Sequence, residues 1–321
     1  MTIMNMVQAI NSALQQEMER NKNILILGED VGKNGGVFRV TESLWQKFGE
    51  ERVVDTPLAE SGIVGSAIGL AVNGFKPVAE IQFDGFSFPA LDQLLSHAAK
   101  IRNRSRGRFS CPIVVRIPYG GGIKALEHHS ESPEVHFAHQ PGLKVVVPSS
   151  PYEAKGLLIS ALRDPDPVIF LEPKRIYRSI KEEVPEESYT IPFEAKVVQE
   201  GNDLTIIAYG AMLKVVREAA EKTKYSLEII DLRSISPLDV DTVVNSVKKT
   251  GRAVVVHEAP KNFGVGAEIV AQINENCLLS LKAPVERVCG WDVNVPLPKL
   301  EKYYFPDADR IRKAIEKVMS F

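Results

Sequence analysis

The sequence predicts an α/β protein with two domains, each built on a parallel sheet that helices cover on both faces. Short β-branched runs alternate with helical segments along most of the chain, and the runs are apolar almost throughout. Near-continuous apolar strands are typical of parallel sheets, because their two faces are both buried. With 321 residues, the chain is long enough for about two domains.

Six apolar runs predict the strands of the first domain, and helical periodicity appears between several of them. A helix is expected over residues 89–107, where Leu91, Leu94, Leu95, Ala98 and Ile101 form one apolar stripe. The runs are ILILGEDV (24–31), RVVDTP (52–57), KPVAEIQF (76–83), CPIVVRIP (111–118), LKVVVPSS (143–150) and PVIFLEP (167–173).

The alternation stops from Lys174 to about Pro192, in a charged stretch with little helical periodicity. It then resumes with strands in DLTIIAYGA, LEIIDLRS, RAVVVHEA and VERVCG and with helices between them. We therefore predict a first domain over residues 1–185, a linker over 186–195 and a smaller second domain over 196–321.

Composition excludes several classes of protein. Thirty-nine basic and forty-one acidic residues give a net charge of −2, so neither nucleic acid nor a membrane is an expected partner. No apolar run reaches the eighteen or so residues that a membrane span needs. Cys111, Cys277 and Cys289 lie far apart with no CxxC motif, which predicts buried free thiols and a cytoplasmic protein.

Polar residues gather just after the predicted strands, where open parallel sheets bind their ligands. Glu29 comes after ILIL in the first run, Glu60 after RVV in the second and Gln82 with Phe86 after KPVAEI in the third, while EHHSESPEVHFAHQPG lies beyond IVVRI in the fourth. Two acids, a glutamine, aromatic rings and four histidines are therefore expected on one edge of the sheet, which predicts a functional site there.

Glu60 stands at the head of a predicted helix that then runs through GIVGSAIGLAVNG without a charge. One interpretation is an ordinary first-turn acid that the helix dipole favours. The other is a partly buried carboxyl that stays part-protonated near neutral pH and exchanges a proton with a ligand. The residues alone leave both interpretations open.

Three further motifs could suggest a metal, dinucleotide or phosphate site, but another explanation is favoured for each. The four histidines could hold a metal, but a helical zinc site would need i, i+4 spacing, so acid–base work or a loop without a role is favoured. GVGAEI at Gly264 lacks the third glycine of a dinucleotide fingerprint, which favours a closely packed helix start. RNRSRGR (102–108) lies at a helix end, where exposed cations complement the dipole.

Several motifs occur together in one order: GEDVG, DTPLAESGIVGSAIGLAVNG, AEIQFDGFSFPALDQL, HHSESPE, FAHQPGLKVVVPSSPYEAKGLL, DPDPVIFLEPK, IDLRSISPLD and VCGWDVNVPLP. From Met6 to Phe321 the chain closely resembles the β subunit of the E1 component of thiamine-diphosphate-dependent 2-oxo acid dehydrogenases. The resemblance implies a pyrimidine-binding α/β domain followed by a transketolase C-terminal-like α/β domain.

The resemblance also assigns roles to residues at the predicted edge. It implies that Glu60 shares a proton with the aminopyrimidine ring of thiamine diphosphate, which favours the second interpretation of this acid. Phe86 matches the ring that stacks on the cofactor, and Leu58 and Gln82 match neighbouring contact positions. Glu29 matches an acid that links the two active sites by proton transfer, and His129 matches the histidine that assists acyl transfer to the lipoyl arm. The neighbouring His128 is expected to point elsewhere, because adjacent residues in an extended segment face opposite sides.

The chain contains no GDG motif of the kind with which thiamine enzymes hold the diphosphate through Mg²⁺. The resemblance therefore implies a separate E1 α subunit that holds Mg²⁺, in an α₂β₂ heterotetramer. Some relatives also bind K⁺ through segments that match Ile113 and the stretch with Ala161, Asp164 and Asp166. Val114 and Asp166 replace side chains found in those relatives, which leaves the ion open.

We therefore expect an E1 β subunit that decarboxylates a 2-oxo acid and reductively acylates the lipoyl groups of an E2 core. HHSESPE and AEIQFDGF slightly favour branched-chain acids over pyruvate. Two alternatives are the C-terminal half of a split transketolase-like enzyme and a non-catalytic flavodoxin-like binding subunit. Glu60, Phe86 and His129 on one edge argue against the second alternative.

Overall fold

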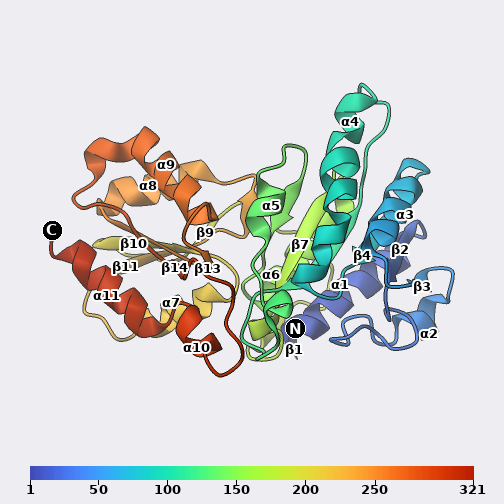
Figure 1. Ribbon diagram of the computed structural model, residues 1–321, viewed down its shortest axis with the longest axis horizontal. Coiled ribbons are helices and arrows are strands. Elements are labelled where there is room, and N and C mark those ends of the chain that lie inside the picture. The colour runs from blue at the N-terminus through green and yellow to red at the C-terminus, as the bar shows by residue number, and fades with distance from the viewer.

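Two sheets form the framework of the computed structural model, which describes residues 1–321 (Figure 1). The first sheet has seven strands in the order β12-β6-β7-β5-β4-β2-β3, and the second has five in the order β14-β13-β10-β11-β9. Each sheet is parallel except for one edge strand, because β12 runs antiparallel to β6 and β9 antiparallel to β11. The prediction of two α/β domains is confirmed.

All six apolar runs of the first domain become strands, and these strands are parallel to one another. They are β2 (Ile24–Gly28), β3 (Val53–Asp55), β4 (Lys76–Glu80), β5 (Val114–Tyr119), β6 (Lys144–Val146) and β7 (Val168–Pro173). Nearly every residue of these strands is buried, as strands covered on both faces require.

Helices cover both faces of this sheet. The pair α1 (Met6–Arg20) and α6 (Pro151–Arg163) packs on one face, and α3 (Glu60–Val72) packs on the other (Figure 1). Two shorter helices, α2 (Leu44–Phe48) and α5 (Glu134–Ala138), lie in the connections.

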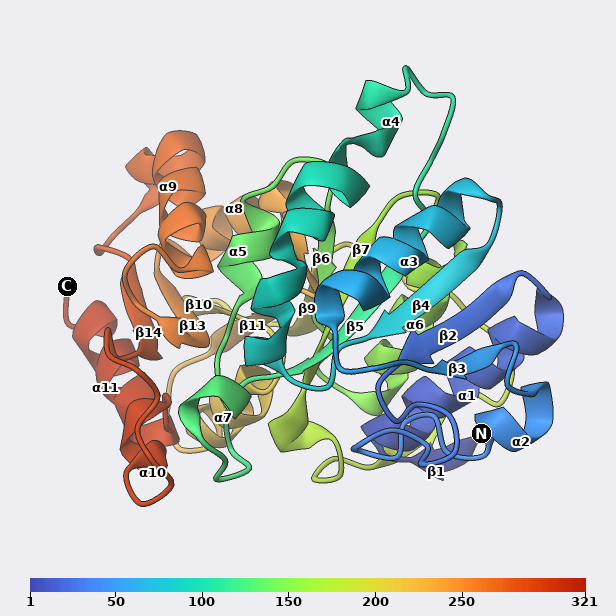
Figure 2. The same ribbon diagram turned by 45° about the vertical axis from the view of Figure 1, so that its right-hand side comes forward.

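The helix predicted over 89–107 is helical but irregular. It consists of the 3₁₀ turns η1 (Asp84–Ala90) and η3 (Ala98–Lys100), the π turn η2 (Gln93–His97) and α4 (Ile101–Arg104). Pro89 lies inside η1 and cannot donate the hydrogen bond of a regular turn. The predicted apolar stripe still packs into the core, while α4 projects beyond the body of the domain (Figure 2).

The second domain repeats the arrangement on a smaller scale. Its strands are β9 (Lys196–Gln199), β10 (Leu204–Ala208), β11 (Leu227–Asp231), β13 (Ala253–Pro260) and β14 (Glu286–Gly290). Its helices are α7 (Met212–Ala220), α8 (Val240–Thr250), α9 (Val265–Cys277), α10 (Glu301–Tyr304) and α11 (Ala308–Met319). The short 3₁₀ turns elsewhere are η4 (Glu127–His129), η5 (Lys174–Ile176) and η6 (Leu278–Ser280).

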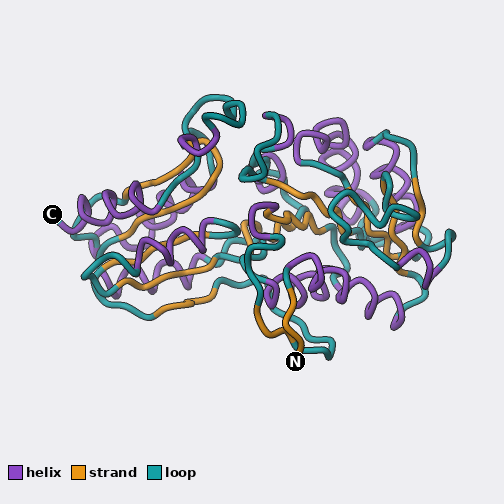
Figure 3. The backbone as a smooth tube through the Cα atoms, turned by 90° about the horizontal axis from the view of Figure 1, so that it is seen from below, coloured by secondary structure: helices purple, strands orange, loops and turns teal.

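Two strand pairings join segments that are far apart in the sequence. β1 (Thr2–Met4) pairs antiparallel with β8 (Glu182–Val184). The N-terminus therefore lies near the boundary between the two domains (Figure 3). β12 (Ser234–Ser236) leaves the second domain and adds an edge strand to the first sheet. The charged stretch that follows Lys174 is therefore partly ordered as a strand.

The core has two layers, one on each side of the sheets, and each layer continues from one domain into the other. One layer contains 45 buried side chains and includes those of α1, α6, α7 and α11. The other contains 37 and includes those of α3, α8 and α9. All three cysteines are buried and free. None of the helices is both long and apolar enough to span a membrane.

Candidate active site

The carboxyl ends of β2, β3 and β4 lie at one level of the first sheet. Gly28 pairs with Asp55 on one side and with Glu80 on the other. The polar residues that follow these three strands therefore emerge on the same edge, as the sequence predicted.

Glu60 is the first residue of α3, and its side chain is half-buried. The neighbouring Ser61 hydroxyl donates a hydrogen bond to the Pro89 carbonyl, which fastens the start of α3 to η1, the turn that carries Phe86. Leu58, just before the helix, is 63% exposed. The edge therefore presents a carboxyl group beside an exposed apolar side chain.

Glu29 lies close to Glu60. Burial raises the pKa of Glu29, and the charges of Asp30 and Glu60 raise it further. The Gln82 side-chain amide approaches the Glu29 carbonyl at 3.5 Å, so the turns after β2 and β4 meet here. Two carboxyl groups that influence each other can pass a proton between them or share one.

Four rings pack together next to these acids. The His129 ring centroid lies 4.1 Å from that of Phe83 and 5.2 Å from that of Phe86. Burial lowers the pKa of His129, and the charges of His128 and Lys174 lower it further. His129 Nδ1 is buried without a hydrogen-bond partner. The imidazole of His129 therefore holds a proton less readily than an exposed histidine does, and its Nδ1 makes no hydrogen bond within the chain.

The expectation that His128 faces away from His129 was wrong. That expectation assumed an extended segment, whereas residues Glu127–His129 form a 3₁₀ turn. The two histidine rings lie 4.2 Å apart, and the His128 ring lies 6.1 Å from that of Phe86. Both histidines therefore belong to the aromatic cluster, although the side chain of His128 is 43% exposed.

Sequence reasoning missed a buried ion pair under the cluster. Lys174 Nζ lies 2.9 Å from Asp84 Oδ1 and 5.5 Å from the centre of the Phe83 ring, and both charged side chains are fully buried. Burial raises the pKa of Asp84 to about 7 although Lys174 opposes the shift. The two residues are 90 positions apart, and the only signal was that each follows a predicted strand.

Comparisons with known proteins decide the family. The transketolase pyrimidine-binding domain matches residues 3–179, and the transketolase C-terminal domain matches residues 194–311. The pyruvate dehydrogenase E1 component subunit beta of Acholeplasma laidlawii is 55% identical over 322 residues, which are 99% of this chain and 98% of that protein. The same subunit of Bacillus subtilis (strain 168) is 52% identical over the full length of both chains.

This chain belongs to the pyruvate dehydrogenase E1 β-subunit family. As an E1 β subunit, it is an enzyme component that works with an α subunit. The pyrimidine-binding domain implies that thiamine diphosphate takes part in the reaction. The slight preference for branched-chain acids finds no support, because these relatives are named for pyruvate.

A solved structure shares the fold. It is described as a split-gene transketolase, inactive β4 tetramer, and it matches 99% of this E1 β chain and 98% of its own with a TM-score of 0.80. The sequences are 22% identical, so this likeness concerns the fold alone.

The residues expected to bind K⁺ make other contacts in this E1 β subunit. Asp164 Oδ2 lies 2.5 Å from Lys144 Nζ, and Asp166 Oδ1 lies 2.6 Å from Arg102 Nε. The backbone carbonyls of Ile113 and Ala161 already accept hydrogen bonds within the fold. Cations of the protein therefore pair with both side-chain carboxylates, while K⁺ binding through the backbone carbonyls of these segments stays a prediction.

The interpretation of GVGAEI as a closely packed helix start is confirmed. A Cβ atom on Gly264 or Gly266 would press against the buried ring of His257. This contact explains both glycines without a dinucleotide.

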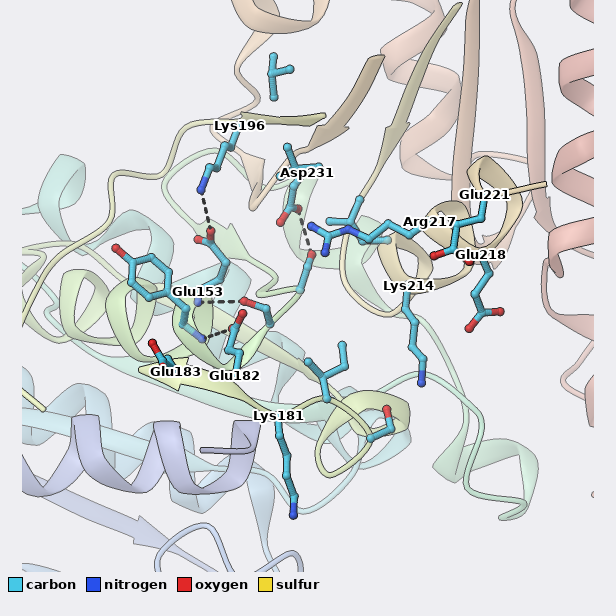
Figure 4. A pocket seen from close by; sticks show the side chains of 18 residues that line it. Glu153, Lys181, Glu182, Glu183, Lys196, Lys214, Arg217, Glu218, Glu221 and Asp231 are labelled. Carbon is cyan, nitrogen blue, oxygen red and sulfur yellow. Dashed lines mark hydrogen bonds and ion pairs between the residues drawn. The ribbon is translucent and has the colours of Figure 1, made fainter. Parts of the chain in front are cut away.

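A cavity of about 720 Å³ lies between the two domains (Figure 4). Glu153 and Lys196 approach each other across it, and Asp231 accepts a hydrogen bond from Ser149 at 3.0 Å. None of the predicted site residues lines this cavity. The predicted site lies instead at the edge of the first sheet, where Leu58 is 63% exposed.

Proposed function

We propose that this chain supplies the pyrimidine half of a thiamine diphosphate site in a pyruvate dehydrogenase E1 enzyme. The observation that carries the proposal is the meeting of Glu60, Phe86 and His129 on one open edge of the first sheet. A separate α subunit would supply the diphosphate half together with Mg²⁺, since this chain has no GDG motif.

The residues of the edge fit an aminopyrimidine ring. The partly exposed Phe86 ring offers a stacking face, Leu58 offers an apolar contact, and the amide of Gln82 lies beside them. Glu60 would share a proton with a ring nitrogen, and Glu29 would exchange protons with Glu60. When bound, thiamine diphosphate supplies the carbon nucleophile and accepts the electrons released with carbon dioxide.

His129 would act in the second half of the reaction, the transfer of the acyl group to the lipoyl arm of E2. Opening of the lipoyl dithiolane leaves a thiolate that needs a proton. The protonated imidazole of His129 would deliver it at the mouth of the site and then regain a proton from solvent. The lowered pKa of His129 means that its protonated ring releases a proton readily, and the unpartnered Nδ1 is consistent with a role in proton transfer.

We also propose that the enzyme assembles as an α₂β₂ heterotetramer, docks on a lipoyl-bearing E2 core and works in the cytoplasm. The open edge with the predicted site supports the α–β contact, and the free thiols support a reducing compartment.

The test is to reconstitute this chain with its α subunit and to assay pyruvate, 3-methyl-2-oxobutanoate and a ketose phosphate with an artificial electron acceptor. We expect pyruvate to have the highest kcat/KM. A higher kcat/KM for 3-methyl-2-oxobutanoate would show that the enzyme prefers branched-chain 2-oxo acids. Ketol transfer without lipoyl acylation would show a split transketolase instead.

A further inference from the structure

The loop that carries the two histidines is held at both ends by the other domain. We define the histidine loop as residues 120–131. Its base is closed within the first domain, where the Gly120 N–H donates to the Glu131 carbonyl at 2.8 Å. Two glycines at its start have φ angles of +77° and +93°, which only glycine adopts without strain.

Glu301 of α10 holds the start of the loop by a direct hydrogen bond. The Gly122 N–H donates to Glu301 Oε1 at 2.6 Å, although 179 residues separate the two. Glu301 is 5% exposed, so this bond to a carboxylate is shielded from water and is stronger than one between neutral groups. A Cβ atom on Gly121, just before Gly122, would overlap the ring of Phe305, so the backbone is also packed tightly against the residue that follows α10.

Glu258 of β13 contacts the same turn. One of its carboxylate oxygens lies so close to Gly120 that a Cβ atom there would collide with it. Burial raises the pKa of Glu258 to about 7, while Arg175 opposes the shift. Glu258 is fixed by its strand, which lies in the interior of the second sheet.

Tyr209 holds the chain just beyond the loop. Its hydroxyl donates to Glu134 Oε1 at 2.7 Å, and both side chains are buried. Tyr209 follows β10 of the second domain, and Glu134 begins α5 of the first. The second domain therefore contacts the chain before and after the two histidines.

We call the contacts of Glu301, Glu258 and Tyr209 with the histidine loop and its flanks the clamp. The segment that carries Glu301 is itself held in place. Tyr304 and Phe305 pack with Val295 in a small buried cluster next to Glu301. The Tyr304 carbonyl accepts a hydrogen bond from Arg310 Nη1 at 3.2 Å, which ties the end of α10 to α11. A shift of α10 would therefore disturb contacts inside the second domain.

We propose that Glu301, Glu258 and Tyr209 are positioning residues that fix the histidine loop, and with it the place of His129 beside Phe86. The expected effect on activity rests on the proposed role of His129 in acyl transfer. The clamp on the loop stands on geometry alone and can be tested without that role.

The variants are Glu301→Ala, which removes the acceptor of the Gly122 N–H, and Glu301→Gln, which keeps an oxygen in its place. Tyr209→Phe removes only the hydroxyl that bonds to Glu134, so it tests the same loop even if Glu301→Ala does not fold. Lys302→Ala, an exposed neighbour on α10, is the matched control. All are studied as the reconstituted α–β complex.

Two readouts are compared. Hydrogen exchange of residues 122–130 should quicken by about tenfold in Glu301→Ala and by less in Tyr209→Phe, with α11 unchanged. Lipoyl acylation should fall about tenfold in Glu301→Ala, while decarboxylation with an artificial acceptor falls by less than about threefold. Glu301→Gln should restore most of the loss, and Lys302→Ala should match wild type.

Unchanged exchange in the loop for both Glu301→Ala and Tyr209→Phe would overturn the clamp. Faster exchange with equal losses in both half-reactions would confirm the clamp but overturn its link to His129, and would count against the proposed role of that histidine. Faster exchange throughout α11 as well would mean that Glu301 stabilises the domain in general, and this too would overturn the inference.

Discussion

The two domains have the same layered architecture but place the polar residues at their strand ends differently. In the first domain, Glu29 and Glu60 follow their strands at an open edge and stay partly exposed. In the second domain, the corresponding polar groups, Asp231, His257 and Glu258, are at most 4% exposed. Two of these buried groups face the first domain, since Asp231 bonds to Ser149 and Glu258 lies on Gly120.

The difference indicates how one fold serves two purposes. A strand-end carboxyl that remains accessible can meet a ligand, whereas one that is covered by a neighbouring domain holds that domain in place. We therefore expect the first domain to carry the residues that contact the cofactor and the second domain to hold the first in position. The predictions below test this division.

The largest effect is expected at the accessible edge. Glu60→Gln keeps the shape of the side chain but removes its acidic proton, so turnover of the α–β complex should fall by about 10²- to 10⁴-fold with the fold intact. Steady-state assays at saturating thiamine diphosphate measure the loss, and exposed Glu50→Gln is the control. Activity of Glu60→Gln within about threefold of wild type would remove this residue from the mechanism.

Buried charge inside the first sheet should matter for stability. Arg116 is fully buried between Glu172, at 2.7 Å, and Glu80, at 2.5 Å. Arg116→Met leaves two carboxylates without their cation, so unfolding should become easier by about 3 to 5 kcal/mol. Denaturant titration against exposed Arg108→Met checks this value, and a loss below about 1 kcal/mol would show that the network is dispensable.

His129 should separate the two half-reactions. His129→Ala should reduce lipoyl acylation by at least about 10²-fold, because a positioned proton donor is lost. Decarboxylation with an artificial acceptor depends on Glu60 and should fall by clearly less. His128→Ala is the natural comparison, since its ring lies in the same cluster. A larger selective loss for His128→Ala would assign the role to that histidine.

The smallest effect concerns the buried acids of the second domain. Burial raises the pKa of Asp231 to about 7 from 3.8, so the folded state binds a proton that the unfolded chain releases. Its contribution to stability is therefore present below about pH 4 and lost as the pH rises towards 7.

Asp231→Asn keeps one acceptor oxygen for the Ser149 hydroxyl and removes this titration. Its stability relative to wild type should rise by roughly 2 kcal/mol between pH 5 and pH 8. Scanning calorimetry of the α–β complex across this range checks the slope, with exposed Asp241→Asn as the control. A difference that does not change with pH would mean that Asp231 remains ionised in the folded protein.

Local patterns in the sequence were enough to predict the parallel strands of both sheets and the edge that carries Glu29, Glu60 and Phe86. What they could not predict depends on contacts between distant segments. The strand β12 crosses to the first sheet, and Lys174 meets Asp84 across 90 positions. Neither pairing leaves a periodic signal. The placement of His128 failed for a local reason, because the turn at 127–129 is helical rather than extended.

The central claim is that this chain holds only half of a cofactor site. Calorimetric titration of thiamine diphosphate with Mg²⁺ into the isolated chain, into the α subunit and into their complex tests it most directly. The account predicts tight binding by the complex and weak or absent binding by the isolated chain, and Glu60→Gln or Phe86→Ala should weaken binding by the complex. Micromolar binding by the isolated chain would contradict the divided site.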